Sequence, residues 1–293
     1  MTFVAELAIN GALVGLMYAL VASGIVLVYK SSGVVNLAQG GFVMAGAYLV
    51  WAYIARLGLG LIPGILAAAA SMGALGWLTE RLALRRMIGQ PVIMILMLTF
   101  GLEVVLRGAV PGTLGADTKP MPIPISQAPV WLGDILVNRT YILGAAVAVV
   151  MVALLALFFR TRAGIAMRAV SDDHLAAWAV GIPVERTVAL SWAVSGAVAA
   201  VTGVLWGAVQ GVDWSLSLLL IKALSVAVLG GLDSLSGVVL AGLIVGVFES
   251  VISGYVDPFV GGGTREVVAA VVIFLTVLIR PYGLFGREVI ERV

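Results

Sequence analysis

Residues 160–186 read RTRAGIAMRAVSDDHLAAWAVGIPVER, and they concentrate charge in a chain that is otherwise almost wholly apolar. These 27 residues hold four Arg, two Asp, one Glu and the only His of the chain. Long apolar runs precede and follow them. Such an arrangement is typical of a polar loop that joins two membrane-spanning segments.

The composition of the whole chain agrees with this interpretation. Of its 293 residues, 62% are hydrophobic and 11% are charged, and the mean hydropathy is +1.15. A soluble domain carries about 25% charged residues, so this chain cannot cover a soluble globule with polar surface. Its apolar runs are continuous rather than alternating, which predicts membrane helices and not a β-barrel. There is no Cys, which excludes disulfides and thiolate chemistry.

The sequence therefore predicts an all-α, polytopic membrane helix bundle with about eight to nine spans. The nine apolar runs cover residues 7–28, 34–54, 59–78, 91–106, 141–159, 188–209, 216–229, 235–256 and 267–279. Two of them are irregular. The second begins with polar and glycine residues, and the seventh has only 14 residues, whereas a full crossing needs about 20. We expect these two runs to be broken or re-entrant helices.

We predict one transmembrane domain, residues 1–293, and orient it by the positive-inside rule. Nine crossings place eleven of the seventeen basic residues on one side, which should be cytoplasmic. The N-terminus is then outside and the C-terminus inside, loop 160–186 is cytoplasmic, and loop 109–140 is external. The external loop holds five of the ten prolines and should be irregular. The net charge of +2 is explained by the basic residues of the loops, whose placement sets the orientation, and does not indicate a nucleic-acid partner.

A short helix is predicted inside loop 160–186. Ser171 is a suitable N-cap, and Asp172 and Asp173 would place negative charge at the positive end of the helix dipole. Gly181 provides a C-terminal stop, and Pro183 blocks continuation.

The predicted helix is amphipathic, because Leu175, Trp178 and Ala179 are spaced three and four residues apart. A helix of this length cannot bury an apolar face alone. It either lies on the ends of its own membrane helices or docks into another protein.

The ionisable groups within the apolar runs need individual interpretation. Glu103 and Arg107 are spaced i,i+4 and should pair. Lys222 either extends outward toward Asp213 or contacts a substrate or a neighbouring helix. Glu249 stands late in its run and is expected at the interface.

Helices interrupted at membrane depth leave backbone groups unpaired, so they are tolerated where they line a cavity or are buried in protein. On this ground we predict a substrate path along the two irregular runs, formed by Asn36, Gln39, Gly40, Gly41, Lys222, Gly230 and Gly231. The chain has no P-loop sequence, no gathered catalytic set, and one His without any Cys, so ATP binding, enzymatic activity and a metal site are not expected.

In sequence, the chain resembles the permease subunits of ABC importers for branched-chain amino acids. The resemblance extends along nearly the whole chain and is carried by NGAL (10–13), GLMYAL (15–20), VNLAQG (35–40), MAGAY (44–48), TFGL (99–102), RA (168–169), GI (181–182), KA (222–223), VLGG (228–231) and PYGLFG (281–286). The family often has His at the position of Gln39 and Asn at the position of Asp173.

The resemblance implies a coupling role for loop 160–186, whose short helix would sit in a groove of an ATPase subunit. The coupling residues would be Asp172, Asp173, Leu175, Ala177, Trp178 and Gly181. The implied partners are a second, related permease, two P-loop ATPases that bind the ATP, an extracytoplasmic binding protein and the lipid bilayer of a bacterial or archaeal plasma membrane. The chain itself would need no cofactor.

The substrate implied by the resemblance is a branched-chain or other small hydrophobic amino acid. Import of urea, amides or other small organic solutes by the same mechanism stays open. An ion-coupled secondary transporter is a further alternative, although no buried acidic relay is evident in the sequence.

Overall fold

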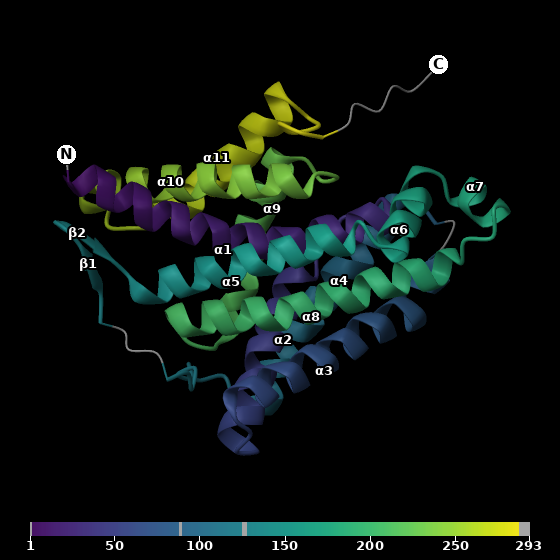
Figure 1. Cartoon of the computed structure of the whole chain (residues 1–293), viewed down its shortest axis with the longest axis horizontal. Helices are drawn as coiled ribbons and strands as arrows, with labels where there is room; N and C mark the ends of the chain where they lie inside the picture. Colours follow the sequence, from purple (N-terminus) through teal and green to yellow (C-terminus); the bar gives the residue numbers. More distant parts are fainter. Residues whose placement is uncertain (1, 88–89, 125–127, 287–293) are drawn as a thin grey trace. The chain divides into compact units, whose positions relative to one another are not determined.

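The structure is a computed structural model that describes residues 2–87, 90–124 and 128–286 (Figure 1). The described residues are mainly helical, with one small β-hairpin. The elements in chain order are α1 (Thr2–Ser32), α2 (Gln39–Trp51), the π-helical turn η1 (Ala52–Arg56), α3 (Leu61–Leu82), the 3-10 turn η2 (Leu84–Met87), α4 (Val92–Leu114), β1 (Val130–Leu132), β2 (Ile135–Val137), α5 (Arg139–Phe158), α6 (Arg162–Asp172), α7 (His174–Ala179), α8 (Val184–Gln210), the 3-10 turn η3 (Trp214–Leu218), α9 (Leu219–Gly230), α10 (Leu235–Val260) and α11 (Thr264–Ile279).

The predicted all-α membrane fold is confirmed. Six helices of the described residues are long and apolar enough to cross a membrane, and they are α1, α3 with η2, α4, α5, α8 and α10. The other three apolar helices have 13, 12 and 16 residues in α2, α9 and α11. At 1.5 Å per residue these reach roughly 18 to 24 Å, less than the ~30 Å hydrocarbon core. The predicted count of eight to nine spans is therefore slightly loose.

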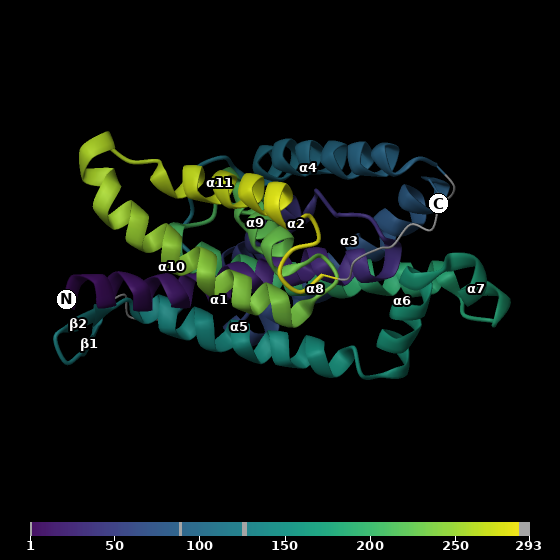
Figure 2. The same cartoon turned by 90° about the horizontal axis from the view of Figure 1, so that it is seen from above.

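The chain forms two compact units, each built from separate segments. The first unit comprises residues 1–26, 126–150 and 221–293. Its α1 and α10 approach closely because glycines face each other: a Cβ on Gly15 would overlap the backbone of Gly242, and one on Gly246 would overlap that of Gly11. Small residues allow such close helix packing in membranes, where apolar burial alone does not drive association. In Figure 2, α10 turns sharply into α11.

The second unit comprises residues 27–125 and 151–220. Helix α8 is its centre and packs against both α2 and α3. Glycines again permit the contact: a Cβ on Gly46 of α2 would overlap Ala200 of α8, and one on Gly76 of α3 would overlap the carbonyl group of Trp192. Buried Phe42 and Trp192 meet edge-to-face, with ring centroids 5.9 Å apart.

Loop 109–140 is more ordered than the prolines suggested. Helix α4 continues to Leu114 with Pro111 inside it, and residues 130–137 form the antiparallel hairpin β1–β2. Pro111 has no N–H, so it leaves the carbonyl group of Arg107 without its helix donor. Of the described residues between α4 and the hairpin, 115–124 and 128–129 belong to no helix or named strand.

That segment is held to residue 212 and to the turn after it. Lys119 and Val212 exchange backbone hydrogen bonds of 3.0 and 2.8 Å. The Lys119 ammonium lies 2.8 Å from Asp117, and its hydrogen bond holds the pKa of that carboxyl group below the usual value. Burial raises the pKa of Asp213, but hydrogen bonds from Ser215 and Thr118 outweigh it, so this pKa is also lowered.

Candidate functional site

The charged stretch 160–186 folds into two short helices that lead into α8. In Figure 1, α6 lies near the start of α8 and α7 extends beyond it. The first of them, α6, is capped by Thr161, whose hydroxyl accepts a hydrogen bond from the Gly164 N–H at 3.5 Å. Ser171 was predicted to be an N-cap, and it does not act as one. It lies in the last turn of α6, a helix that was not predicted.

Asp173 separates the two helices and caps the second. Its backbone is extended, and its carboxylate accepts a hydrogen bond from the Ala176 N–H at 3.0 Å. The other predicted first-turn acid, Asp172, instead ends α6. The sequence placed the helix start two residues too early because Ser171 and Asp173 are both good capping residues.

Gly181 ends α7 as predicted. Its φ of +83° lies in the left-handed region that favours glycine. The Ile182 N–H donates to the Ala177 carbonyl group and the Gly181 N–H to the Trp178 carbonyl group, both at 3.0 Å. This pair of bonds is the Schellman arrangement, which satisfies the last carbonyl groups of a helix.

The exposed side of α7 and its C-terminal turn is apolar. Ala177 is buried, but the side chains of Trp178 and Val180 are 74% and 76% exposed, and Ala179 is also exposed. The described residues thus leave most of the Trp178 side chain and part of Ala179 uncovered. The predicted role of the Leu175 side chain lies outside what the structure describes. Val180 was missed by the sequence analysis, which followed only the i,i+3 and i,i+4 spacing.

The predicted substrate-path residues fall into both units. In the second unit, Asn36 and Gln39 are completely buried. The Gln39 side-chain oxygen accepts hydrogen bonds from Asn36 at 3.2 Å and from Ser195 at 2.9 Å. No acceptor among the described residues reaches Gln39 Nε2. Asn36 also accepts from the Ala38 N–H, so it shapes the backbone just before α2.

Gly40 and Gly41 serve close packing at the start of α2. A Cβ on Gly40 would overlap the carbonyl oxygen of Ser217, and one on Gly41 would lie 2.5 Å from the Glu103 carboxylate. The Gly41 N–H donates to Glu103 at 2.5 Å. Glu103 also lies 3.7 Å from Arg107, which confirms the predicted i,i+4 pair.

In the first unit, Lys222 is buried and lies 2.8 Å from Glu249, which itself is 3% exposed. The Tyr18 hydroxyl donates to the same carboxylate oxygen at 3.2 Å. Lys222 therefore contacts a neighbouring helix, which was one of its two predicted roles, and Glu249 is buried against protein. Two buried opposite charges on α9 and α10 pair with each other because neither can be left unpaired in an apolar interior.

Gly230 and Gly231 lie near this pair in sequence but serve a turn. A Cβ on Gly230 would overlap Gly237, and one on Gly231, whose φ is +97°, would overlap Gly286. Both glycines therefore hold the end of α9 close to α10 and to the segment after α11.

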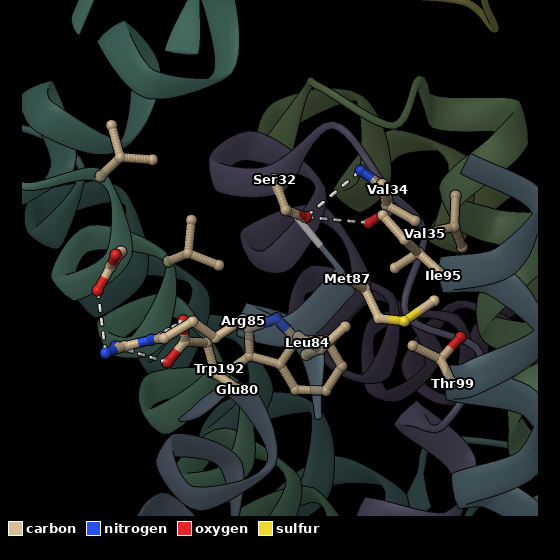
Figure 3. Close-up of a pocket in the computed structure, with 13 residues that line it drawn as sticks. Ser32, Val34, Val35, Glu80, Leu84, Arg85, Met87, Ile95, Thr99 and Trp192 are labelled. Atoms are coloured by element: carbon tan, nitrogen blue, oxygen red, sulfur yellow. Dashed lines mark hydrogen bonds and ion pairs between the residues drawn. The ribbon is translucent and has the colours of Figure 1, made fainter. Parts of the chain in front are cut away.

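The sequence analysis missed a pocket of about 170 Å³ in the second unit, drawn in Figure 3. The walls of the pocket are mainly apolar. The charged residues Glu80, Arg85 and Glu185 also line the pocket. In the sequence, Glu80 and Arg85 follow the apolar run 59–78, and no motif links them to Glu185. No group of three His, Cys, Asp or Glu residues suited to a metal ion occurs in the described part of the chain.

Comparison with known proteins covers nearly the whole chain. The sequence model of the family described as branched-chain amino acid transport system / permease component matches residues 7–279. The chain is 33% identical to the high-affinity branched-chain amino acid transport system permease protein LivH of Escherichia coli K12, over 97% of this chain and 96% of that protein. The corresponding BraD protein of Pseudomonas aeruginosa is also 33% identical, with the same coverage.

A solved structure shares the fold. PsaBC from Streptococcus pneumoniae, in complex with Fab, matches with a TM-score of 0.52 and 16% identity, over 93% of this chain and 91% of that one. The family match, the full-length relatives and the six apolar helices lead to one conclusion: this chain is a multi-pass membrane protein that belongs to the family of permease components of branched-chain amino acid transport systems.

Proposed function

We propose that the chain is the transmembrane permease subunit of an ATP-driven importer for branched-chain or other small hydrophobic amino acids. Its partners are a second, related permease, two P-loop ATPases and an extracytoplasmic binding protein, in a bacterial or archaeal plasma membrane. The chain itself binds no ATP or other cofactor and catalyses no reaction. The N-terminus is outside and the C-terminus is cytoplasmic.

One observation carries the coupling part of this proposal. Helix α7 is capped at both ends, yet Trp178 within it and Val180 just after it are about three-quarters exposed. Large apolar side chains exposed on a rigid, defined turn are typical of a protein contact surface. Since the relatives are transport permeases, an ATPase subunit is the partner that this surface fits.

The mechanism follows from the connection of α7 to α8. Gly181 and Pro183 join the two helices within a few residues, so movement of a docked α7 is passed directly to α8. Helix α8 packs against α2 and α3. Closure of the ATPases on ATP would thus shift the helices around α8 and open the path alternately to each side of the membrane.

A detergent pull-down with tagged chain tests the docking. Trp178→Asp places a charge on the exposed surface without touching the core, and it should abolish retention of a P-loop ATPase. Trp131→Asp is the matched control, because Trp131 is 68% exposed but lies on the hairpin strand β1, outside loop 160–186. The control should retain the ATPase fully.

Gly181→Arg is a second docking variant, since a side chain at φ +83° strains the end of α7. Retention of the ATPase by both docking variants would contradict the proposed contact. Absence of any ATPase from the wild-type sample would favour the ion-coupled alternative.

A further inference from the structure

The pocket in Figure 3 lies between the end of α1, the α3–η2 turn, α4 and the first turns of α8. Its apolar wall is formed by Val34, Val35, Leu84, Met87, Ile95, Val188 and Trp192. The volume of about 170 Å³ is slightly larger than that of engineered protein cavities of ~150 Å³ that bind benzene. An aliphatic or phenyl side chain of four to seven carbon atoms therefore fits this wall.

Three charged groups also line the pocket. The buried Glu80 carboxylate holds Arg85 through two contacts, at 3.4 Å to Nε and 3.2 Å to Nη2. Glu185 lies 2.9 Å from Arg85 Nη1 and is 57% exposed, whereas Glu80 is only 2% exposed. Glu80 thus fixes the guanidinium group, and Glu185 is the partner that can move away.

The charges offer a partner to each end of an amino acid. A ligand carboxylate can take the place of Glu185 on Arg85 Nη1, since planar guanidinium donors suit carboxylates. The released Glu185 carboxylate can then accept the ligand ammonium group. The two acids and one Arg carry a net charge of −1, so they favour a ligand that brings a cationic group.

We propose that this pocket binds a zwitterionic α-amino acid with an aliphatic or phenyl side chain. The substrate class rests on the proposed function, but the location does not. The ammonium and carboxylate groups bind Glu185 and Arg85, and the side chain occupies the apolar wall.

The position of Glu185 links the site to the exposed helix. Glu185 lies in the first turn of α8, only four residues after the glycine that ends α7. A shift of α7 would therefore move Glu185 relative to Arg85, which Glu80 holds on η2. Ligand affinity at the pocket would change when α7 engages a partner.

Equilibrium binding of tritiated leucine to the purified full-length chain tests the site. Glu185→Gln removes the mobile carboxylate but keeps the Arg85–Glu80 pair, and it should weaken binding at least about tenfold. Val188→Phe fills the apolar wall and should abolish binding. Two control variants should bind leucine with an affinity within about twofold of wild type. They are Leu190→Phe, at an exposed position on the same helix, and Asp134→Asn, in the hairpin turn.

Competitors separate the two charged contacts. Isocaproate lacks the ammonium group and isoamylamine lacks the carboxylate, so each should compete at least about tenfold less well than leucine. Equal competition by either compound would overturn the assigned contacts. A wild-type pocket that retains a co-purified lipid and binds no leucine would overturn the site.

Leucine uptake by the assembled importer distinguishes this inference from the function on which it rests. Normal uptake by wild type, with Glu185→Gln and Val188→Phe equally active and equally able to bind leucine, would overturn the pocket alone. Absence of leucine uptake by the wild-type complex would overturn the proposed substrate, and the inference with it.

Discussion

Lys222 and Glu249 show how strongly a single residue can depend on a partner far away in sequence. The two buried side chains lie 2.8 Å apart on α9 and α10, and Tyr18 of α1 donates to the same carboxylate oxygen. Three helices therefore meet at one polar cluster. Removing one member of a buried pair leaves an uncompensated charge in the interior, which costs about 3–5 kcal/mol.

We expect Lys222→Met to lower the stability of the chain by roughly that amount. The double variant Lys222→Met/Glu249→Gln should recover most of the loss, because the unpaired charge is gone and the introduced amide oxygen would still accept from Tyr18. Thermal unfolding in detergent, followed by size-exclusion chromatography, measures both. A single variant as stable as wild type, or a double variant no better than the single, would show that the pair is not needed for folding.

Element packing depends on where the glycines of each helix point. On α1 and α10 the glycines face each other, whereas a Cβ on Gly101 or Gly108 of α4 would meet no atom within 4 Å. Gly246→Ala should therefore separate α1 from α10 and cost about 1–3 kcal/mol through overpacking. Gly101→Ala is the matched control and should change the stability by no more than about 0.5 kcal/mol.

The same thermal assay in detergent compares these two glycine variants. An equal loss of stability from both would mean that helix flexibility, and not the α1–α10 contact, determines the effect. No loss from either would mean that the two helices can move apart without cost.

Local signals in the sequence predicted the features that depend on neighbouring residues. The polar break before α2, the stop at Gly181 and the Glu103–Arg107 pair were all predicted, since each rests on residues within a few positions. The predicted start of the helix that ends at Gly181 was wrong, because Ser171 and Asp173 are both good capping residues and stand only two positions apart.

Features that depend on distant residues could not be predicted in this way. The Lys222–Glu249 pair joins two helices, and Glu185 reaches Arg85 from a helix that begins about a hundred residues later. The pocket drawn in Figure 3 brings together side chains from segments up to about a hundred residues or more apart. Val184, Val188 and Trp192 are spaced four residues apart, which indicates one helix face but not the segments that this face meets.

At the scale of the whole molecule, the fold and the family are those of a membrane permease. We infer that transport is driven by ATP through the surface of α7. The most direct measurement is leucine uptake into liposomes that contain the chain with its second permease, the ATPases and the binding protein. Trp178→Asp and Trp131→Asp are compared with wild type.

The account predicts uptake that requires ATP and the binding protein, is lost in Trp178→Asp, and is unchanged in Trp131→Asp. Loss of uptake in Trp178→Asp should be accompanied by loss of transport-coupled ATP hydrolysis, because an ATPase that does not contact α7 cannot couple hydrolysis to transport. Trp131→Asp alters a different surface and should keep both activities. Uptake that continues without the ATPases and stops with an uncoupler would contradict the account and identify an ion-coupled transporter instead.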